Sequence, residues 1–170
     1  MALPEPWLCA EAIETPRLRL DSLTPEDAEA MHPVLDDQRL HEYSGGQPLA
    51  LEELRTWYQF LARGLSPDGQ EVWLNWIVRL DGEAIGYLQA GVDEMLIAQV
   101  AWVIGVAWQG NGYGSESAAA MVEWLLANKV EAVIAAIHPG HEASAGVARR
   151  CGLVLTEHVV DGERIWRRDA

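Results

Sequence analysis

Glycines at alternate positions, Gly110, Gly112 and Gly114, mark the segment of this chain that is best suited to bind an anion. Glycine allows the backbone to approach a ligand closely, and the first amide groups of a helix have no intrahelical acceptor. A helix that begins at about Gly112 would let several N–H groups converge on one phosphate. The spacing therefore indicates a pyrophosphate as the ligand, although glycine turns also occur for purely conformational reasons.

Two nucleotide-binding motifs do not fit this segment. A Rossmann fingerprint requires an acidic residue at the end of the next strand, and the next predicted strand ends in Ile137-His138-Pro139. A P-loop requires Gly-Lys-Ser/Thr, and Lys129 is the only lysine in the chain. The glycine segment therefore belongs to neither class.

The elements around the glycine segment follow from hydrophobic periodicity and turn residues. Residues 97–104 are a nearly continuous apolar run, which predicts a central strand buried on both faces. Thr24 predicts an N-cap, Pro25 a first helical position, and two Asp-Gly pairs, 81–82 and 161–162, predict hairpin turns. The predicted strands are 17–23, 73–80, 83–92, 97–104, 132–137, 154–160 and 165–168; the predicted helices are 24–35, 51–63, 115–128 and 143–150, with a loop over 36–48.

The composition favours one ordinary globular domain over 1–170, with a loose leader over 1–14. The formal net charge of -14 disfavours nucleic acid as a partner; it favours a cationic substrate, or else serves solubility alone. No apolar stretch reaches membrane-spanning length and no signal peptide is indicated, so we expect a cytoplasmic protein without a membrane partner. Cys9 and Cys151 form no zinc or disulfide pattern, and no metal is predicted.

The glycine segment and the order of elements resemble the GNAT acetyltransferases, whose acetyl-CoA motif is Gln/Arg-x-x-Gly-x-Gly/Ala. Gln109, Gly112 and Gly114 match this motif. The likeness is strongest to the subgroup that includes the acetylases of ribosomal-protein amino termini. It extends over most of the chain, from Thr15 to Leu153.

A second motif of that subgroup follows at suitable spacing. It has the form His-Pro-x-Asn-x-x-Ser, and a short helix after it ends in Gly-Phe. Residues 138–144 follow this form, with His141 at the asparagine position and Ser144 at the serine, and Gly152-Leu153 takes the place of Gly-Phe. Two motifs in the correct order make the resemblance fairly specific.

The resemblance implies an α+β fold whose mixed, twisted central sheet splays after its fourth strand and is flanked by helices. The pantetheine arm of acetyl-CoA would insert into that gap along the backbone of residues 102–106, and residues 109–115 would hold the pyrophosphate. The implied cofactor-binding residues are Ile104, Gly105, Val106, Gln109, Gly110, Asn111, Gly112, Tyr113, Gly114, Ser115 and His141.

Several positions depart from the family pattern. Gln99 stands where a glutamate often acts through water as a base, and an amide cannot take a proton. Ala148 stands where a tyrosine acid is frequent. Ser144 is then the candidate catalytic residue, which protonates or hydrogen-bonds the leaving thiolate, unless it only holds the pantetheine. His141 either titrates near neutrality or, as we favour, replaces the asparagine that pins backbone or pantetheine.

The expected activity is transfer of an acetyl group from acetyl-CoA to a primary amine by direct attack. The acceptor is a small-molecule amine or a protein amino terminus, and Glu42, Tyr43 and residues 73–76 fall where related folds build its pocket. A solvated loop and a packed strand are the alternative for those residues. The rival function is a catalytically silent CoA-binding sensor or interaction domain, and transfer of a longer acyl group is a third. Eight tryptophans suit a filled core or a homodimer interface.

Overall fold

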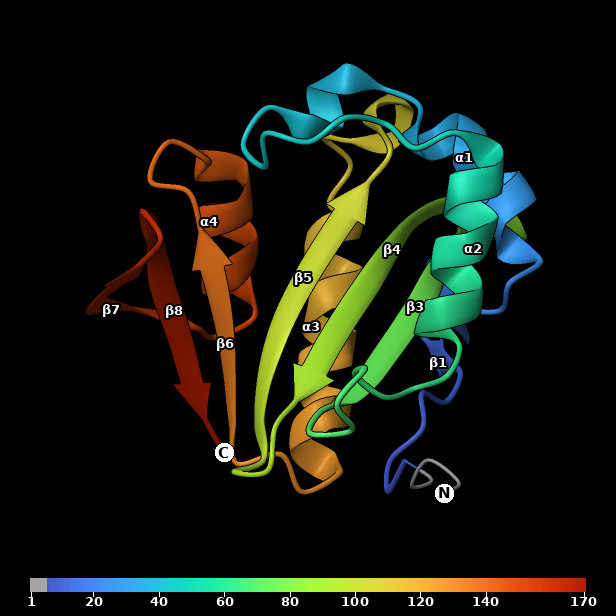
Figure 1. Cartoon of the computed structure of the whole chain (residues 1–170). Coiled ribbons are helices and arrows are strands. Elements are labelled where there is room, and N and C mark those ends of the chain that lie inside the picture. The colour runs from blue at the N-terminus through green and yellow to red at the C-terminus, as the bar shows by residue number, and fades with distance from the viewer. Residues whose placement is uncertain (1–5) are drawn as a thin grey trace.

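The computed structural model describes residues 6–170 and contains one eight-stranded sheet in the order β1-β2-β3-β4-β5-β6-β8-β7. Neighbouring strands are antiparallel except for β5 and β6, which are parallel (Figure 1). The elements are β1 Ile13–Glu14, β2 Leu18–Ser22, α1 Asp27–Leu35, the 3-10 helix η1 Gln38–His41, α2 Leu51–Leu61, β3 Val72–Leu80, β4 Glu83–Val92, β5 Ile97–Ile104, η2 Val106–Trp108, α3 Tyr113–Ala127, β6 Ala132–Ile137, α4 Glu142–Arg150, β7 Val154–Val160 and β8 Glu163–Asp169.

Local signals predicted the elements well because turn chemistry and periodicity fix them. The α+β fold and the order of the predicted elements are confirmed, and the predicted bounds of β4, β5, β6 and β7 coincide with the observed ones. In both Asp-Gly hairpins the two turn residues have positive φ, 49° and 83° at Asp81 and Gly82 and 50° and 81° at Asp161 and Gly162. These angles match a two-residue turn whose twist suits the flanking strands.

Three local expectations need correction. Thr24 does not cap α1, because the helix begins two residues beyond Pro25 and the backbone N–H of Thr24 instead donates to the Asp27 carboxylate at 2.8 Å. The last two residues of the expected leader, Ile13 and Glu14, pair with β2 as strand β1. Part of the expected loop over 36–48 is helical, as η1.

Strand β5 is central but is not buried on both faces, contrary to the prediction. Gln99 and Ala101 are exposed, whereas Ala98 and Val100 are buried. The reason is the distribution of helices: α3 packs against β5 on one face, whereas α1 and α2 cover only β4 and β3 on the other (Figure 1). One face of β5 therefore stays open beside those two helices.

The sheet separates between β5 and β6. Only three residue pairs join these strands, from Ile97 with Ala132 to Gln99 with Ile134. Beyond them β5 continues to Ile104 with β4 as its only neighbour, and the two strands diverge towards the end near α4 (Figure 1). The backbone of residues 100–104 is thus unpaired along one edge. This is the splay that the resemblance implied.

Two buried clusters hold the layers together. The larger one lies between the sheet and α3 and α4, and it includes Trp76, Leu88 and Met121. The smaller one lies between α1, α2 and the opposite face of β3 and β4, and it includes Met31 and Ile77. Large apolar side chains are therefore buried on both faces of β3 and β4, which stabilises this half of the sheet.

Gly86 on β4 has no room for a side chain. A Cβ atom there would lie 2.2 Å from the carbonyl oxygen of Val103 in the middle of the sheet. We therefore expect Gly86→Ala to lower the free energy of unfolding by about 1–3 kcal/mol, the usual range for an overpacked interior. Gly146→Ala on α4, where a Cβ would meet nothing within 4 Å, is the matched control and should keep or slightly raise stability. Equal urea midpoints for both variants would contradict this expectation.

Candidate active site

The glycine segment forms the junction between β5 and α3. Gly110 and Gly112 both have left-handed backbones, with φ of 82° and 81°. Gly112 is the N-cap of α3 and provides no side-chain cap, so the first amides of the helix have no acceptor from that residue. The predicted helix start at about Gly112 is therefore correct, and the first amides of α3 have no hydrogen-bond partner within residues 6–170.

The turn is open where a ligand would approach. A Cβ at Gly110 would meet nothing within 4 Å, and one at Gly112 would meet only the guanidinium of Arg17 at 3.4 Å. Gly114 differs, because its Cβ position lies 3.6 and 3.7 Å from the side chains of Ile104 and Val147, which are ordinary contacts. The first two glycines therefore leave space above the turn, whereas Gly114 lies against its neighbours from β5 and α4.

Two amide side chains brace the turn from within. Gln109 Nε2 donates to the carbonyl of Ile104 at 2.9 Å. Asn111 Nδ2 donates to the carbonyls of Trp108 and Gln109 at 3.0 and 3.3 Å. The side chains of Gln109 and Asn111 thus hold the backbone in shape, and the groups left for a ligand at these positions are on the main chain.

Two arginines lie beside this turn in an otherwise acidic protein. Arg17 forms an ion pair of 2.7 Å with Glu116 in the first turn of α3 and lies 4.6 Å from the centre of the Tyr113 ring. Arg150, at the end of α4, donates to Ser115 Oγ at 3.1 Å. Partial burial opposes ionisation of Glu116, but hydrogen bonds from Thr15 and Arg17 outweigh it and lower the pKa of Glu116. Sequence reasoning missed both arginines, since neither is near the glycines in the chain.

The second motif forms the loop between β6 and α4. His141 is the N-cap of α4, and its Nδ1 accepts from the backbone N–H of Ser144 at 3.4 Å. The ring of Tyr43 stacks on that of His141 at 4.2 Å and 17°, and its hydroxyl donates to the carbonyl of Gly140 at 3.3 Å. The loop after η1 therefore crosses the end of β5 and contacts the loop before α4 (Figure 1). It spans the open end of the splay.

The cap made by His141 gives a testable pH dependence. Burial lowers the pKa of His141 from its ordinary value of 6.5, a lowering that Glu42 opposes and His138 reinforces. The His141 ring therefore binds a proton more readily in the unfolded chain than in the folded one. The stabilisation that the neutral ring provides is complete above pH 6.5 and declines as the pH falls below it.

His141→Asn keeps a capping side chain but has no titrating ring. We therefore expect the free energy of unfolding of this variant to decrease less than that of the parent below pH 6.5. Urea unfolding at intervals between pH 8 and pH 5 measures it. Parallel pH profiles for parent and variant would contradict the role assigned to this ring.

The positions named for proton transfer lie on two elements, Ser144 and Ala148 on α4 and Gln99 on β5. Ser144 is half-buried in the first turn of α4, and its hydroxyl forms no hydrogen bond with any part of the chain from residue 6 onwards. Ala148 is fully buried against the core. Gln99 is exposed at the start of β5, on the same face as Val103.

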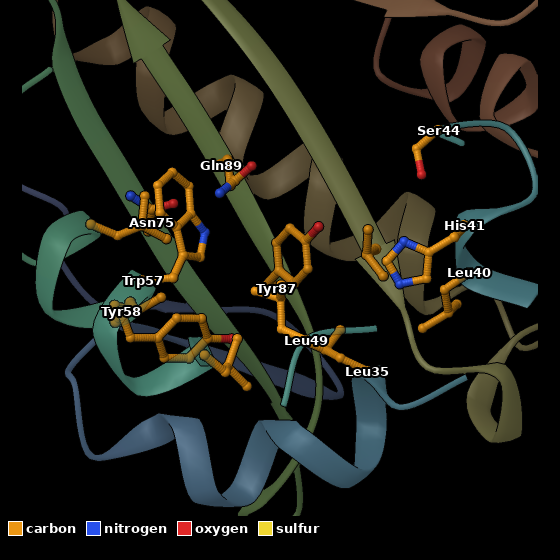
Figure 2. A pocket seen from close by; sticks show the side chains of 14 residues that line it. Leu35, Leu40, His41, Ser44, Leu49, Trp57, Tyr58, Asn75, Tyr87 and Gln89 are labelled. Carbon is orange, nitrogen blue, oxygen red and sulfur yellow. The ribbon is translucent and has the colours of Figure 1, made fainter. Parts of the chain in front are cut away.

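A cavity of about 300 Å³ lies on the open face, between α1, α2, the loop around η1, and strands β3 to β5. Figure 2 shows its 14 lining residues. Eight of them are apolar, and the other six are His41, Ser44, Tyr58, Asn75, Tyr87 and Gln89. The strand register explains the shared face, because Asn75 pairs with Gln89 and Tyr87 pairs with Val103.

The residues predicted for an acceptor pocket correspond only in part to this cavity. Glu42 and Tyr43 do not line it, but their neighbours His41 and Ser44 do, and of residues 73–76 only Asn75 does. Tyr58 was visible in the sequence only as part of an apolar helical stripe. A tyrosine on such a stripe is a signal in itself, since its buried hydroxyl usually requires a partner.

None of the helices within residues 6–170 has the length and hydropathy to cross a membrane. Within the same range, no three His, Cys, Asp or Glu side chains are grouped so as to hold a metal ion.

A mixed sheet that opens beside a glycine turn, with a separate cavity on its open face, is the architecture of an acyltransferase, and that is the class of this enzyme. Residues 17–154 match the family model of the acetyltransferase (GNAT) domain, and the chain belongs to the GNAT family. The resemblance found in the two motifs is thereby confirmed. A search of curated proteins gave no match.

Solved structures share the fold at low sequence identity. A ribosomal alpha-N-protein acetyltransferase, RimL, in complex with coenzyme A has 18% identity and a TM-score of 0.77, over 94% of this chain and 98% of that one. An acetyltransferase from Salmonella typhimurium that modifies the N-terminal serine of a 50S ribosomal subunit protein has 18% identity and a TM-score of 0.76, over 94% and 99%. A microcin self-immunity acetyltransferase in complex with acetyl-CoA and AMP has 12% identity and a TM-score of 0.75, over 92% and 94%.

Proposed function

We propose that this protein transfers an acetyl group from acetyl-CoA to a primary amine. The observation that carries the proposal is the continuity between the unpaired edge of β5 and the open glycine turn. An extended pantetheine arm can bond to such an edge as a strand would, and the turn that follows offers free amides to the pyrophosphate.

The proposed cofactor contacts follow the chain in order. Backbone groups of Ile104, Gly105 and Val106 serve the arm and the thioester, and residues 109–115 serve the pyrophosphate. The N–H of Gly105 is already bonded to the carbonyl of Ile85 at 2.8 Å, so its neighbours supply the contacts on the open edge. His141 supports the arm from the loop before α4, at the other side of the splay.

Local charge supports an anionic cofactor despite the overall acidity. The formal net charge is -14, yet Arg17 and Arg150 flank the glycine turn from two distant parts of the chain. The phosphates of CoA would meet these two guanidinium groups and the positive end of α3.

The proposed reaction is a direct displacement at the thioester. The lone pair of a neutral amine attacks the carbonyl carbon, a C–N bond forms, and the oxyanion is stabilised by backbone N–H groups at the end of β5. The C–S bond then breaks, the departing thiolate takes a proton from the Ser144 hydroxyl, which regains one from water, and the nitrogen loses its own proton to water. Gln99 cannot accept that proton because it is an amide.

The acceptor is proposed as a small-molecule amine or a protein amino terminus. Two of the similar solved structures are acetyltransferases of ribosomal proteins, which supports the second possibility. The same proposal places the enzyme in the cytoplasm, where acetyl-CoA and nascent chains meet. The homodimer stays a prediction that sedimentation velocity would test.

An acetylation assay tests the proposal. Purified protein with acetyl-CoA is followed for release of free thiol against a panel of amines and of peptides with free or blocked amino termini, and products are weighed by mass spectrometry. We expect an increase of one acetyl group on at least one free amine and none on blocked peptides. Binding of CoA without turnover of any amine would favour the silent CoA-binding domain instead.

A further inference from the structure

The cavity on the open face lacks the carboxylates that make the chain as a whole strongly acidic. The chain contains 26 acidic and 12 basic side chains, and none of those within residues 6–170 lines the cavity, where His41 is the titratable imidazole. Asp27 lies on α1 near the cavity, but its carboxylate forms an ion pair with Arg79 at 2.6 Å. A cationic group placed here would lose its hydration without gaining a counter-ion, which is costly.

Two polar atoms in the wall have no partner. Tyr58 and Asn75 are only 3% and 7% exposed, and both the Tyr58 hydroxyl and the Asn75 carboxamide oxygen are buried without a hydrogen bond in the chain beyond residue 5. Buried polar groups are nearly always bonded, and leaving one unsatisfied costs about 1–3 kcal/mol. The two oxygens are themselves closed off, so each side chain must turn towards the cavity before a ligand can bond to it, and a ligand that then bonds to them recovers this cost.

The chemical state of Tyr58 is suited to this role. Burial raises the pKa of Tyr58, and the nearby Tyr87 and Asp27 raise it further. The phenol is therefore neutral at physiological pH and can both donate and accept a hydrogen bond. The Asn75 oxygen can only accept, so together the two groups match a hydroxyl or an amide.

The side chains of Tyr58 and Asn75 line the same end of the cavity. Figure 2 shows Tyr58 and Asn75 beside Trp57, whereas His41 and Leu40 line the opposite end. Val103, which also lines the cavity, is the residue next to the end of β5, where the thioester is proposed to lie. An acceptor therefore fits with its amine near the end of β5 and its substituent directed at Tyr58 and Asn75.

We infer that the acceptor carries an uncharged, largely apolar substituent of about the size of an aromatic ring, with a hydroxyl or amide that bonds to Tyr58 and Asn75. The inference rests on the proposed function, since it specifies the substrate class of the same enzyme. It narrows the expectation of a cationic acceptor that the net charge suggested: the amine is cationic before it loses its proton, but the substituent is uncharged, because the acidic side chains of residues 6–170 lie outside the cavity.

Three matched amines test the inference at saturating acetyl-CoA: tyramine, phenethylamine, which lacks only the hydroxyl, and agmatine, whose substituent is charged. We expect kcat/KM for tyramine to exceed that for phenethylamine by about tenfold, equivalent to about 1.4 kcal/mol, and that for agmatine by about 100-fold. In Tyr58→Phe the preference for tyramine over phenethylamine should fall towards one. Tyr43→Phe, which removes a hydroxyl outside the cavity, is the control and should keep it.

The melting temperature distinguishes a binding role of the Tyr58 hydroxyl from a structural one. Tyr58→Phe deletes a hydroxyl that has no partner, so its melting temperature should equal or exceed that of the parent. If agmatine is the best acceptor, or if Tyr58→Phe keeps the preference for tyramine, the inference is overturned while the proposed function stands.

If no amine is acetylated, the proposed function fails. Binding of 4-methylphenol, followed by NMR, then tests independently of catalysis whether the cavity binds a phenol through Tyr58. Binding that is at least about fivefold weaker in Tyr58→Phe supports the assignment of the hydroxyl. Equal binding, or none to the parent, overturns it.

Discussion

Gly112→Glu is expected to abolish binding of coenzyme A, with affinity falling by at least about 100-fold, or about 2.8 kcal/mol. The new side chain would occupy the space above the turn, and its carboxylate would stand where the pyrophosphate is proposed to bind. Its nearest neighbour would be Arg17, whose guanidinium lies 3.4 Å from the Cβ position. The variant would thus neutralise one of the two cations beside the turn as well as repel the ligand.

Backbone strain must be separated from loss of the site, because Gly112 has a φ of 81° that other residues rarely adopt. Gly162 has the same φ of 81° in the hairpin between β7 and β8, and a Cβ there would meet nothing within 4 Å. Gly162→Glu therefore introduces the same backbone strain and the same negative charge, but at a position away from the glycine turn between β5 and α3. Titration calorimetry with CoA should show parent-like affinity for this control, and unchanged affinity in a folded Gly112→Glu protein would refute the proposed phosphate site.

Ser144→Ala is expected to lower kcat by about 100-fold while CoA affinity stays nearly unchanged. The hydroxyl is half-buried at the start of α4 and has no partner among residues 6–170, so it is free to interact with a sulfur atom in the splay. Its interaction is strongest when the sulfur carries charge, which makes the effect specific to turnover.

The companion variant Ser144→Thr retains the hydroxyl and should recover much of the lost rate. A serine that only holds the pantetheine would instead weaken CoA binding and leave kcat at saturation intact. If kcat of the alanine variant stays within a few-fold of the parent across the pH range, Ser144 is not the acid, and water then protonates the thiolate.

Local features of this protein were predictable from the sequence, and features made by distant segments were not. The glycine turn was placed correctly because a strand, three glycines and an amphipathic helix are contiguous in the chain. The prediction that β5 is buried on both faces was wrong, because its apolar run does not reveal that α1 and α2 do not extend over it. Arg17 and Arg150 were missed for the same reason, since only the fold brings them to the turn.

The cavity is the clearest example of a feature that could not be predicted from the sequence. Its wall combines side chains from α1, η1, α2 and three strands, so no local pattern marks it. Tyr58 and Asn75 look in the sequence like any residues of a helix and a strand. They matter because one oxygen of each has no hydrogen-bond partner within residues 6–170, and only the folded arrangement of their neighbours reveals this.

The separation of β5 from β6 also bears on how this protein avoids aggregation. Residues 100–104 and 135–137 each lack a neighbour on one side, and such edges invite strands of other molecules to add to the sheet. Here the two unpaired edges face each other inside one sheet, and the loop carrying Tyr43 closes the wide end against His141. A second polypeptide chain that extended along either edge would meet this loop at the wide end. The fold thus retains a strand-sized opening in a sheet while protecting both of its margins from intermolecular pairing.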